Sequence, residues 1–201
     1  IGCRDEQLFN ESGFFSTPVL VDLDKDGSLE IVIGGLDSRL YAWHVDGTLL
    51  NGWPVHLQNL NEPAFRDGEL NRLEDRIVAS PAVADLFGDG TPYIVVGTNE
   101  RVLNVNGGFL YAVHPERNAH EGGPFPAGWP VTAAGFIPDE ILPYIGRGNP
   151  SAPVAADMNG DGADEVINAG MGGQMQIIFG DASFGGVVVV GTADVVGCGE
   201  V

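Results

Sequence analysis

Residues 16–35 read STPVLVDLDKDGSLEIVIGG, and this pattern returns as ASPAVADLFGDGTPYIVVGT at 79–98 and as SAPVAADMNGDGADEVINAG at 151–170. In each copy a proline stands four residues before an aspartate, and an Asp-Gly pair begins four residues after that aspartate. Agreement at so many fixed offsets does not arise by chance. A pattern that returns at such intervals is the signature of repeat architectures, so we interpret the chain as three copies of one unit.

A second motif follows the first in two of the copies. LYAWH at 40–44 returns as LYAVH at 110–114, and GWPV at 52–55 returns at 128–131. The third copy departs from the pattern after Gly170: the segment MQII stands where the aromatic motif is expected, and no Gly-Trp-Pro follows. The repeats are therefore placed at about 14–57, 77–132 and 149–180, and the tail 181–201 is left unassigned.

The residue types within a unit predict short β-strands. Runs rich in β-branched residues, such as 19–21 and 31–33, are bounded by turn residues. No stretch keeps a helical period for ten residues, and 69–77 comes nearest to one. Four short strands in each repeated unit are typical of β-propeller blades, with an open sandwich or a solenoid as the alternative. Because propellers usually close with about four to eight blades, we expect a segment of a larger propeller and of a longer protein.

An acidic loop joins the first two strands of each unit. With the first aspartate as position 1, loop one has acids at positions 1, 3, 5 and 9, which are Asp22, Asp24, Asp26 and Glu30. The glycine at position 6 permits a sharp turn that gathers positions 1, 3 and 5, and the carbonyl of Ser28 adds an oxygen at position 7. This many hard oxygen ligands suit Ca²⁺ rather than Zn²⁺. Position 12 is isoleucine where an EF-hand needs glutamate, so the pattern predicts a calcium loop between two strands.

Loops two and three differ in how much of this ligand set they keep. Loop three keeps an oxygen ligand at each of positions 1, 3, 5, 7 and 9, namely Asp157, Asn159, Asp161, the carbonyl of Ala163, and Glu165. Loop two has Phe87 and Tyr93 at positions 3 and 9, so Asp85 and Asp89 predict weak calcium binding or none. The alternative is three acidic turns without an ion, but clustered carboxylates repel one another without a cation. Ions held between two strands would stabilise the fold rather than catalyse a reaction.

The charge balance excludes several classes of function. Asp and Glu number 28 against 9 Lys and Arg, which gives a net charge of -19. Such a chain lacks the basic surface that nucleic acids and anionic lipids require. No apolar run reaches the roughly 18 residues of a membrane span. No Gly-x-Ser-x-Gly elbow, nucleotide loop or converging acid and base groups are visible, so we expect no enzyme.

The run Pro-x-x-x-Asp-x-Asp-x-Asp-Gly-x-x-Glu-Ile-Val-x-Gly at 18–34 resembles the FG-GAP/VCBS-type repeat of integrin-like β-propellers. The Tyr-Ala-Trp and Gly-Trp-Pro elements also occur in secreted bacterial members, and the resemblance covers about 14–179. It implies a propeller, Ca²⁺ in the loops, an extracellular or cell-surface location, and a role in adhesion, ligand binding or scaffolding. A minority of such proteins are polysaccharide lyases or other hydrolases, so the alternative is the propeller scaffold of a carbohydrate-active enzyme.

Two insertions between the units are candidates for contact with a partner. Residues 58–76 and 133–149 both follow Gly-Trp-Pro strands and should emerge on one face, where propeller loops commonly form binding sites. A protein or glycan partner would meet Arg66, Arg72, Tyr144 and Arg147; the alternative is that both insertions are ordinary solvated loops.

Cysteines, tryptophans and histidines complete the set of candidate residues. Cys3 and Cys198 lie at the extremes of the chain, either as a disulfide formed in an oxidising compartment or as two unrelated thiols. Trp53 and Trp129 occupy equivalent positions, which favours packing between units over sugar binding. The equivalence of His44 and His114 likewise favours a structural role for that histidine over catalysis.

Overall fold

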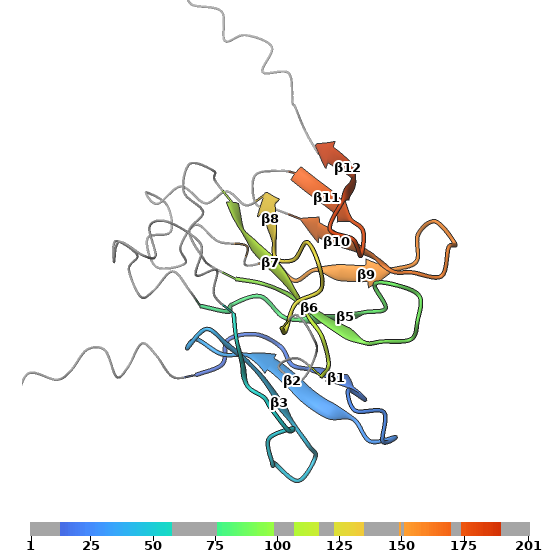
Figure 1. Ribbon diagram of the computed structural model, residues 1–201. Helices are drawn as coiled ribbons and strands as arrows, with labels where there is room; N and C mark the ends of the chain where they lie inside the picture. The colour runs from blue at the N-terminus through green and yellow to red at the C-terminus, as the bar shows by residue number, and fades with distance from the viewer. Residues whose placement is uncertain are drawn as a thin grey trace, which may run out of the picture.

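The computed structural model describes residues 13–57, 76–98, 107–116, 123–134, 149, 151–169 and 174–189. Twelve strands in these residues form three four-stranded antiparallel sheets (Figure 1). The described part of the chain contains no helix, and hence none long and apolar enough to cross a bilayer. The prediction of an all-β chain with four strands in each unit is confirmed.

Each sheet is a meander whose strands follow one another in chain order. Sheet one contains β1 (Val19–Val21), β2 (Glu30–Gly34), β3 (Arg39–Trp43) and β4 (Val55–His56). Sheet two contains β5 (Ala82–Ala84), β6 (Tyr93–Gly97), β7 (Gly107–Val113) and β8 (Val131–Ala134). Sheet three contains β9 (Val154–Ala156), β10 (Glu165–Ala169), β11 (Gln174–Ile178) and β12 (Phe184–Val189).

The first hairpin has the same register in all three sheets. Val21 pairs with Glu30 in sheet one, Ala84 pairs with Tyr93 in sheet two, and Ala156 pairs with Glu165 in sheet three. In each case the residue before position 1 of the acidic loop faces position 9. The three loops are therefore closed by equivalent residue pairs, which is what a repeated unit requires.

Apolar cores fill the spaces on the two sides of sheet two. One cluster joins Val32 and Leu40 of sheet one to Tyr111 of sheet two, and the other joins Leu110 of sheet two to Ile178 of sheet three. Every residue of β6 is buried, and its side chains alternate between these clusters because successive residues of a strand point to opposite faces. Sheet two therefore has a core on each face, and the first strands of neighbouring sheets, β1 with β5 and β5 with β9, are in contact.

The two Gly-Trp-Pro tryptophans connect neighbouring sheets. The indole Nε1 of Trp53 donates to the carbonyl of Pro115, 3.3 Å away, just after β7. The Nε1 of Trp129 donates to the carbonyl of Gly180, 3.0 Å away, just after β11. Both indoles are buried. The expectation that these side chains pack between units is confirmed, and each one reaches the equivalent point of the following sheet.

The third unit is completed by a strand from the tail. Residues 175–178, proposed to replace the aromatic motif, lie in β11, and the unassigned tail supplies β12, which pairs with β11. The candidates Cys3, Cys198, Arg66, Arg72, Tyr144 and Arg147 lie outside the described residues, as does most of the two insertions that start at 58 and 133.

Candidate metal site

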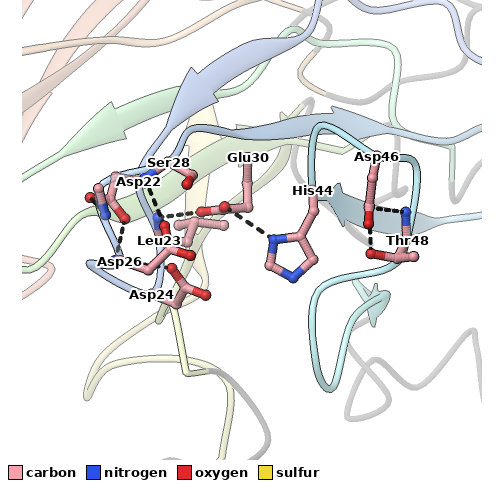
Figure 2. Close-up of polar contacts among 10 residues, drawn as sticks. Asp22, Leu23, Asp24, Asp26, Ser28, Glu30, His44, Asp46 and Thr48 are labelled. Atoms are coloured by element: carbon pink, nitrogen blue, oxygen red, sulfur yellow. Dashed lines mark hydrogen bonds and ion pairs between the residues drawn. The ribbon is translucent and has the colours of Figure 1, made fainter.

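The aspartates of loop one fold the loop around their own carboxylates. Asp22 accepts hydrogen bonds from the backbone N–H of Asp26 at 3.1 Å and of Gly27 at 3.0 Å. Asp26 in turn accepts one from the N–H of Ser28 at 2.7 Å. As a result, carboxylate oxygens of Asp22, Asp24 and Asp26 lie within 4.8 Å of one another (Figure 2). The predicted grouping of positions 1, 3 and 5 is present.

Loops two and three have the same backbone conformation. Asp85 accepts from the N–H of Gly90 at 2.8 Å, and Asp157 accepts from the N–H of Gly162 at 3.0 Å. Positions 4 and 6 have positive φ in all three loops; the residues are Lys25, Gly27, Gly88, Gly90, Gly160 and Gly162. Loop two keeps this geometry without acids at positions 3 and 9. The aspartates at positions 1 and 5 therefore suffice for the turn, and the acids at positions 3 and 9 are left for another role.

The position-5 aspartates are held in their charged form. The backbone N–H and the hydroxyl of Ser28 lower the pKa of Asp26. The N–H of Ala163, followed by the Asn159 side chain, lowers the pKa of Asp161. Thr91 lowers the pKa of Asp89 in the same way through its hydroxyl and its N–H. Each loop therefore presents an exposed anionic group at this position.

Glu30 is the unusual residue of loop one. Its side chain is fully buried, and its Oε2 accepts a hydrogen bond from the N–H of Leu23 at 2.8 Å. Its Oε1 is also buried but accepts no hydrogen bond from the described residues. A buried carboxylate carries a desolvation penalty of several kcal/mol unless it is paired and fully hydrogen-bonded. Loop one therefore contains a buried carboxylate oxygen that accepts no hydrogen bond from the part of the chain that the structure describes.

The equivalent positions in the other loops are satisfied. In loop three, Oε2 of Glu165 accepts from the N–H of Met158 at 2.8 Å, and Oε1 accepts from Nδ2 of Asn159 at 2.9 Å. In loop two the position belongs to Tyr93, whose ring packs edge-on against Phe87 and His114. Position 3 explains the difference, because the amide of Asn159 can donate to the glutamate whereas the carboxylate of Asp24 cannot.

His44 lies beside the unsatisfied oxygen. Its Nδ1 is 3.4 Å from Oε1 of Glu30, and the ligand atoms of Asp24, Glu30 and His44 all lie within 4.8 Å of one another (Figure 2). Residue 44 follows β3, and the pairing of Ile31 with Trp43 places it opposite residue 30. The equivalence of His44 and His114 predicted only a shared structural role for this histidine, whereas the register of β2 and β3 places His44 at the loop.

A cavity of about 470 Å³ adjoins loop one. Loop one and the turn after β3 form one side of this cavity, and loop two and the turn after β7 form the other. Its polar lining residues are Asp24, Lys25, Asn51, Thr91, His114 and Glu116. Asp24 belongs both to this lining and to the acidic cluster, so loop one is open on the side of position 3.

Comparison with models of known protein families finds no match, and a search of the curated proteins finds no match either.

Proposed function

We propose that this chain is a calcium-binding segment of a β-propeller of the FG-GAP/VCBS type, which acts outside the cell in adhesion, ligand binding or scaffolding. The observation that carries the proposal is the buried Oε1 of Glu30, which accepts no hydrogen bond from any described residue and belongs to the loop that gathers three aspartates. A cation in loop one would supply the missing partner and offset the repulsion among the carboxylates.

The donor set fits Ca²⁺ at loop one. Carboxylate oxygens of Asp22, Asp24 and Asp26 form one cluster, and Glu30 joins Asp24 in an adjoining one, so Asp24 links the two. Ca²⁺ takes six to eight oxygen ligands in flexible geometry, which allows one ion to draw on both clusters. Loop three offers the same kinds of atoms once the amide of Asn159 turns its oxygen inward, which costs its hydrogen bonds to Asp161 and Glu165 at 2.9 Å. We therefore expect the tighter site at loop one and a weaker one at loop three.

An ion at loop one would connect two strands. Positions 1 to 5 follow β1, whereas Glu30 is the first residue of β2, so the ion would fasten the hairpin at its open end. Binding to the folded chain alone stabilises it by mass action, by about 2.7 kcal/mol when the free ion is at 100 times its dissociation constant. The role is structural, since the chain's own oxygens supply most of the shell.

The arrangement of the sheets supports the propeller part of the proposal. Three meanders of four strands share one hairpin register, and their first strands lie next to one another in chain order. Radial repetition of four-stranded sheets is how propellers are built, and complete ones usually have about four or more blades. Nothing among the described residues favours the alternative of a carbohydrate-active enzyme.

The test is to count bound ions by calorimetry, titrating Ca²⁺ into the full chain after treatment with EDTA. We expect two ions for the wild type and one for Glu30→Gln, because the substitution removes the charge of the buried ligand. Asp181→Asn, which removes one charge from an exposed turn of sheet three, is the matched control and should still bind two. A wild type that binds no ion, or a Glu30→Gln chain that matches the wild type, would refute the proposal.

The partner requires a separate experiment. A glycan array probed with the calcium-loaded chain distinguishes sugar binding from protein binding, and Arg66→Ala with Tyr144→Ala tests the two insertions. Binding that both substitutions weaken would support the predicted surface. Release of unsaturated uronic-acid products from a polysaccharide would instead support the enzyme.

A further inference from the structure

We propose that loop one also binds a transition-metal ion of the Zn²⁺ type, through Asp24, Glu30 and His44, whereas loop three is restricted to ions that prefer oxygen. This proposal rests on the proposed function, because it specifies which metal ions one of the same two loops accepts.

The distances suit three ligands on one ion. The candidate atoms of Asp24, Glu30 and His44 lie within 4.8 Å of one another, and Oε1 of Glu30 is 3.4 Å from Nδ1 of His44. Zn²⁺ binds nitrogen and oxygen at about 2.0–2.2 Å in tetrahedral geometry, which places neighbouring ligands about 3.3–3.6 Å apart. Glu30 and His44 therefore have the separation of two ligands of one ion before any ion binds.

The nitrogen atom makes this set different from a calcium site. Ca²⁺ prefers hard oxygen ligands, whereas imidazole suits Zn²⁺ and the neighbouring transition metals. With one imidazole and two carboxylates the chain supplies three ligands, and the exposed side of Asp24 leaves room for water as the fourth. Zn²⁺ and Ca²⁺ would share Asp24 and Glu30, so they should compete for loop one.

The surrounding structure holds two of these ligands in place. Glu30 is fully buried and anchored through Oε2 by the N–H of Leu23. His44 is held at the start of a turn, where its own N–H donates to the carbonyl of Thr48 at 2.9 Å and its carbonyl accepts from the N–H of Gly47 at 2.9 Å. Ligands that are already positioned lose less entropy when the ion binds.

Comparison of the three loops shows that only loop one combines these groups. The register of β6 and β7 places His114 opposite Tyr93, so loop two has the imidazole without the carboxylate. The register of β10 and β11 places Phe179 opposite Glu165, so loop three has the carboxylate without the imidazole. Loops two and three therefore serve as internal comparisons, one with the histidine alone and the other with the glutamate alone.

The experiment uses the full chain freed of metal with EDTA, with Zn²⁺ measured by calorimetry and Co²⁺ by its visible absorption. We expect one Zn²⁺ for the wild type, a tetrahedral Co²⁺ spectrum, and a fall from two bound Ca²⁺ ions to one when Zn²⁺ is present. His44→Phe, which introduces the residue that loop three has, should weaken Zn²⁺ at least about tenfold and keep both Ca²⁺ ions. His114→Phe is the control and should bind Zn²⁺ as the wild type does.

The outcomes separate this inference from the proposed function. Binding of Ca²⁺ without Zn²⁺, or unchanged Zn²⁺ affinity in His44→Phe, would overturn this inference alone and would leave His44 as an ion-pair partner of Glu30. Binding of Zn²⁺ through His44 without any Ca²⁺ would overturn the proposed function alone. If circular dichroism shows that His44→Phe does not fold, His44→Gln, which keeps a polar group beside Glu30, replaces it with the same expected results.

Discussion

Glu30→Gln should change the stability of the chain in opposite directions with and without calcium. In EDTA the wild type buries Oε1 of Glu30, which lies 3.4 Å from Nδ1 of His44 but accepts no hydrogen bond from the described residues, and leaving such a group unsatisfied costs about 1–3 kcal/mol. Glutamine removes the charge and still accepts from Leu23, and its NH₂ group can donate to Asp24, as Asn159 does to its own loop's acids. We therefore expect the variant to be more stable by about 1–3 kcal/mol in EDTA.

Calcium should reverse this order. With free Ca²⁺ at 1,000 times its dissociation constant, an ion at loop one adds about 4.1 kcal/mol to the wild type. Because the variant forgoes most of this stabilisation, we expect it to be less stable than the wild type by about 1–3 kcal/mol under these conditions. Urea unfolding followed by tryptophan fluorescence, in EDTA and at saturating Ca²⁺, measures both free energies.

Glu165→Gln is the matched control. Both carboxylate oxygens of Glu165 already accept hydrogen bonds, so glutamine must turn its NH₂ group toward another donor, either the NH₂ of Asn159 or the backbone N–H of Met158. We expect it to lower stability in EDTA by about 1 kcal/mol, opposite in sign to Glu30→Gln. If Glu30→Gln also destabilises the chain in EDTA, Oε1 of Glu30 has an adequate partner in solution, and the reasoning behind the metal site fails.

Three further predictions concern the framework and the pH dependence. Trp129→Phe leaves the carbonyl of Gly180 without its indole donor and should cost about 1–3 kcal/mol in urea unfolding. Lys25→Gly should raise the melting temperature in EDTA, because Lys25 has φ 59° and a left-handed conformation costs a residue with a side chain about 1–2 kcal/mol. Thr48, chiefly through its hydroxyl, lowers the pKa of Asp46, so this bond stabilises the fold fully above the ordinary value of 3.8 and is lost as the pH falls below it. Thr48→Val should therefore reduce the loss of stability between pH 7 and pH 3 when unfolding is measured in EDTA.

Each of these predictions has its own check. Trp43 has a partly exposed ring whose described ring contacts, with Phe14 and Tyr41, stay within the first unit, so Trp43→Phe should cost less than Trp129→Phe. Equal losses would mean that the indole bond of Trp129 contributes nothing. Gly27→Ala places a side chain at φ 91° and should lower the melting temperature, although the added atom would meet nothing within 4 Å. An unchanged stability difference between the two pH values in Thr48→Val would show that Asp46 titrates alike in the folded and unfolded chains.

The parts of the fold that depend on neighbouring residues could be predicted from the sequence. Runs such as 31–33 and the Asp-Gly pairs act within a few residues, so the strands and the acidic loops could be placed correctly. β12 was not placed, because the FGGVVV segment has two glycines and its sequence does not resemble the fourth strands of the other units. A strand of this composition is recognised mainly by the edge of β11 with which it pairs.

The candidate metal site could likewise be predicted from the sequence only where its residues are neighbours in the chain. Asp22 and Asp26 lie close together because they are in one turn, which spacing alone can predict. The contact of His44 with Glu30 depends on the register of β2 and β3. Whether Glu30 lacks a donor depends in turn on burial and on position 3 being Asp24 rather than asparagine. Spacing therefore located the loop, whereas the burial and the pairing that distinguish loop one from loop three required three dimensions.

The tryptophan bonds give the chain a direction of assembly. Trp53 belongs to sheet one, but its acceptor, the carbonyl of Pro115, lies 62 residues further on. At a synthesis rate of about 5–20 residues per second, that acceptor leaves the peptidyl-transferase centre roughly 3–12 seconds after the tryptophan does. The hydrogen bond of Trp129 likewise cannot form until Gly180 has been synthesised. Each newly made unit therefore supplies the hydrogen-bond acceptor for the tryptophan of the unit before it. A ribosome that stalls before this acceptor is made leaves the indole N–H of the preceding unit without its partner.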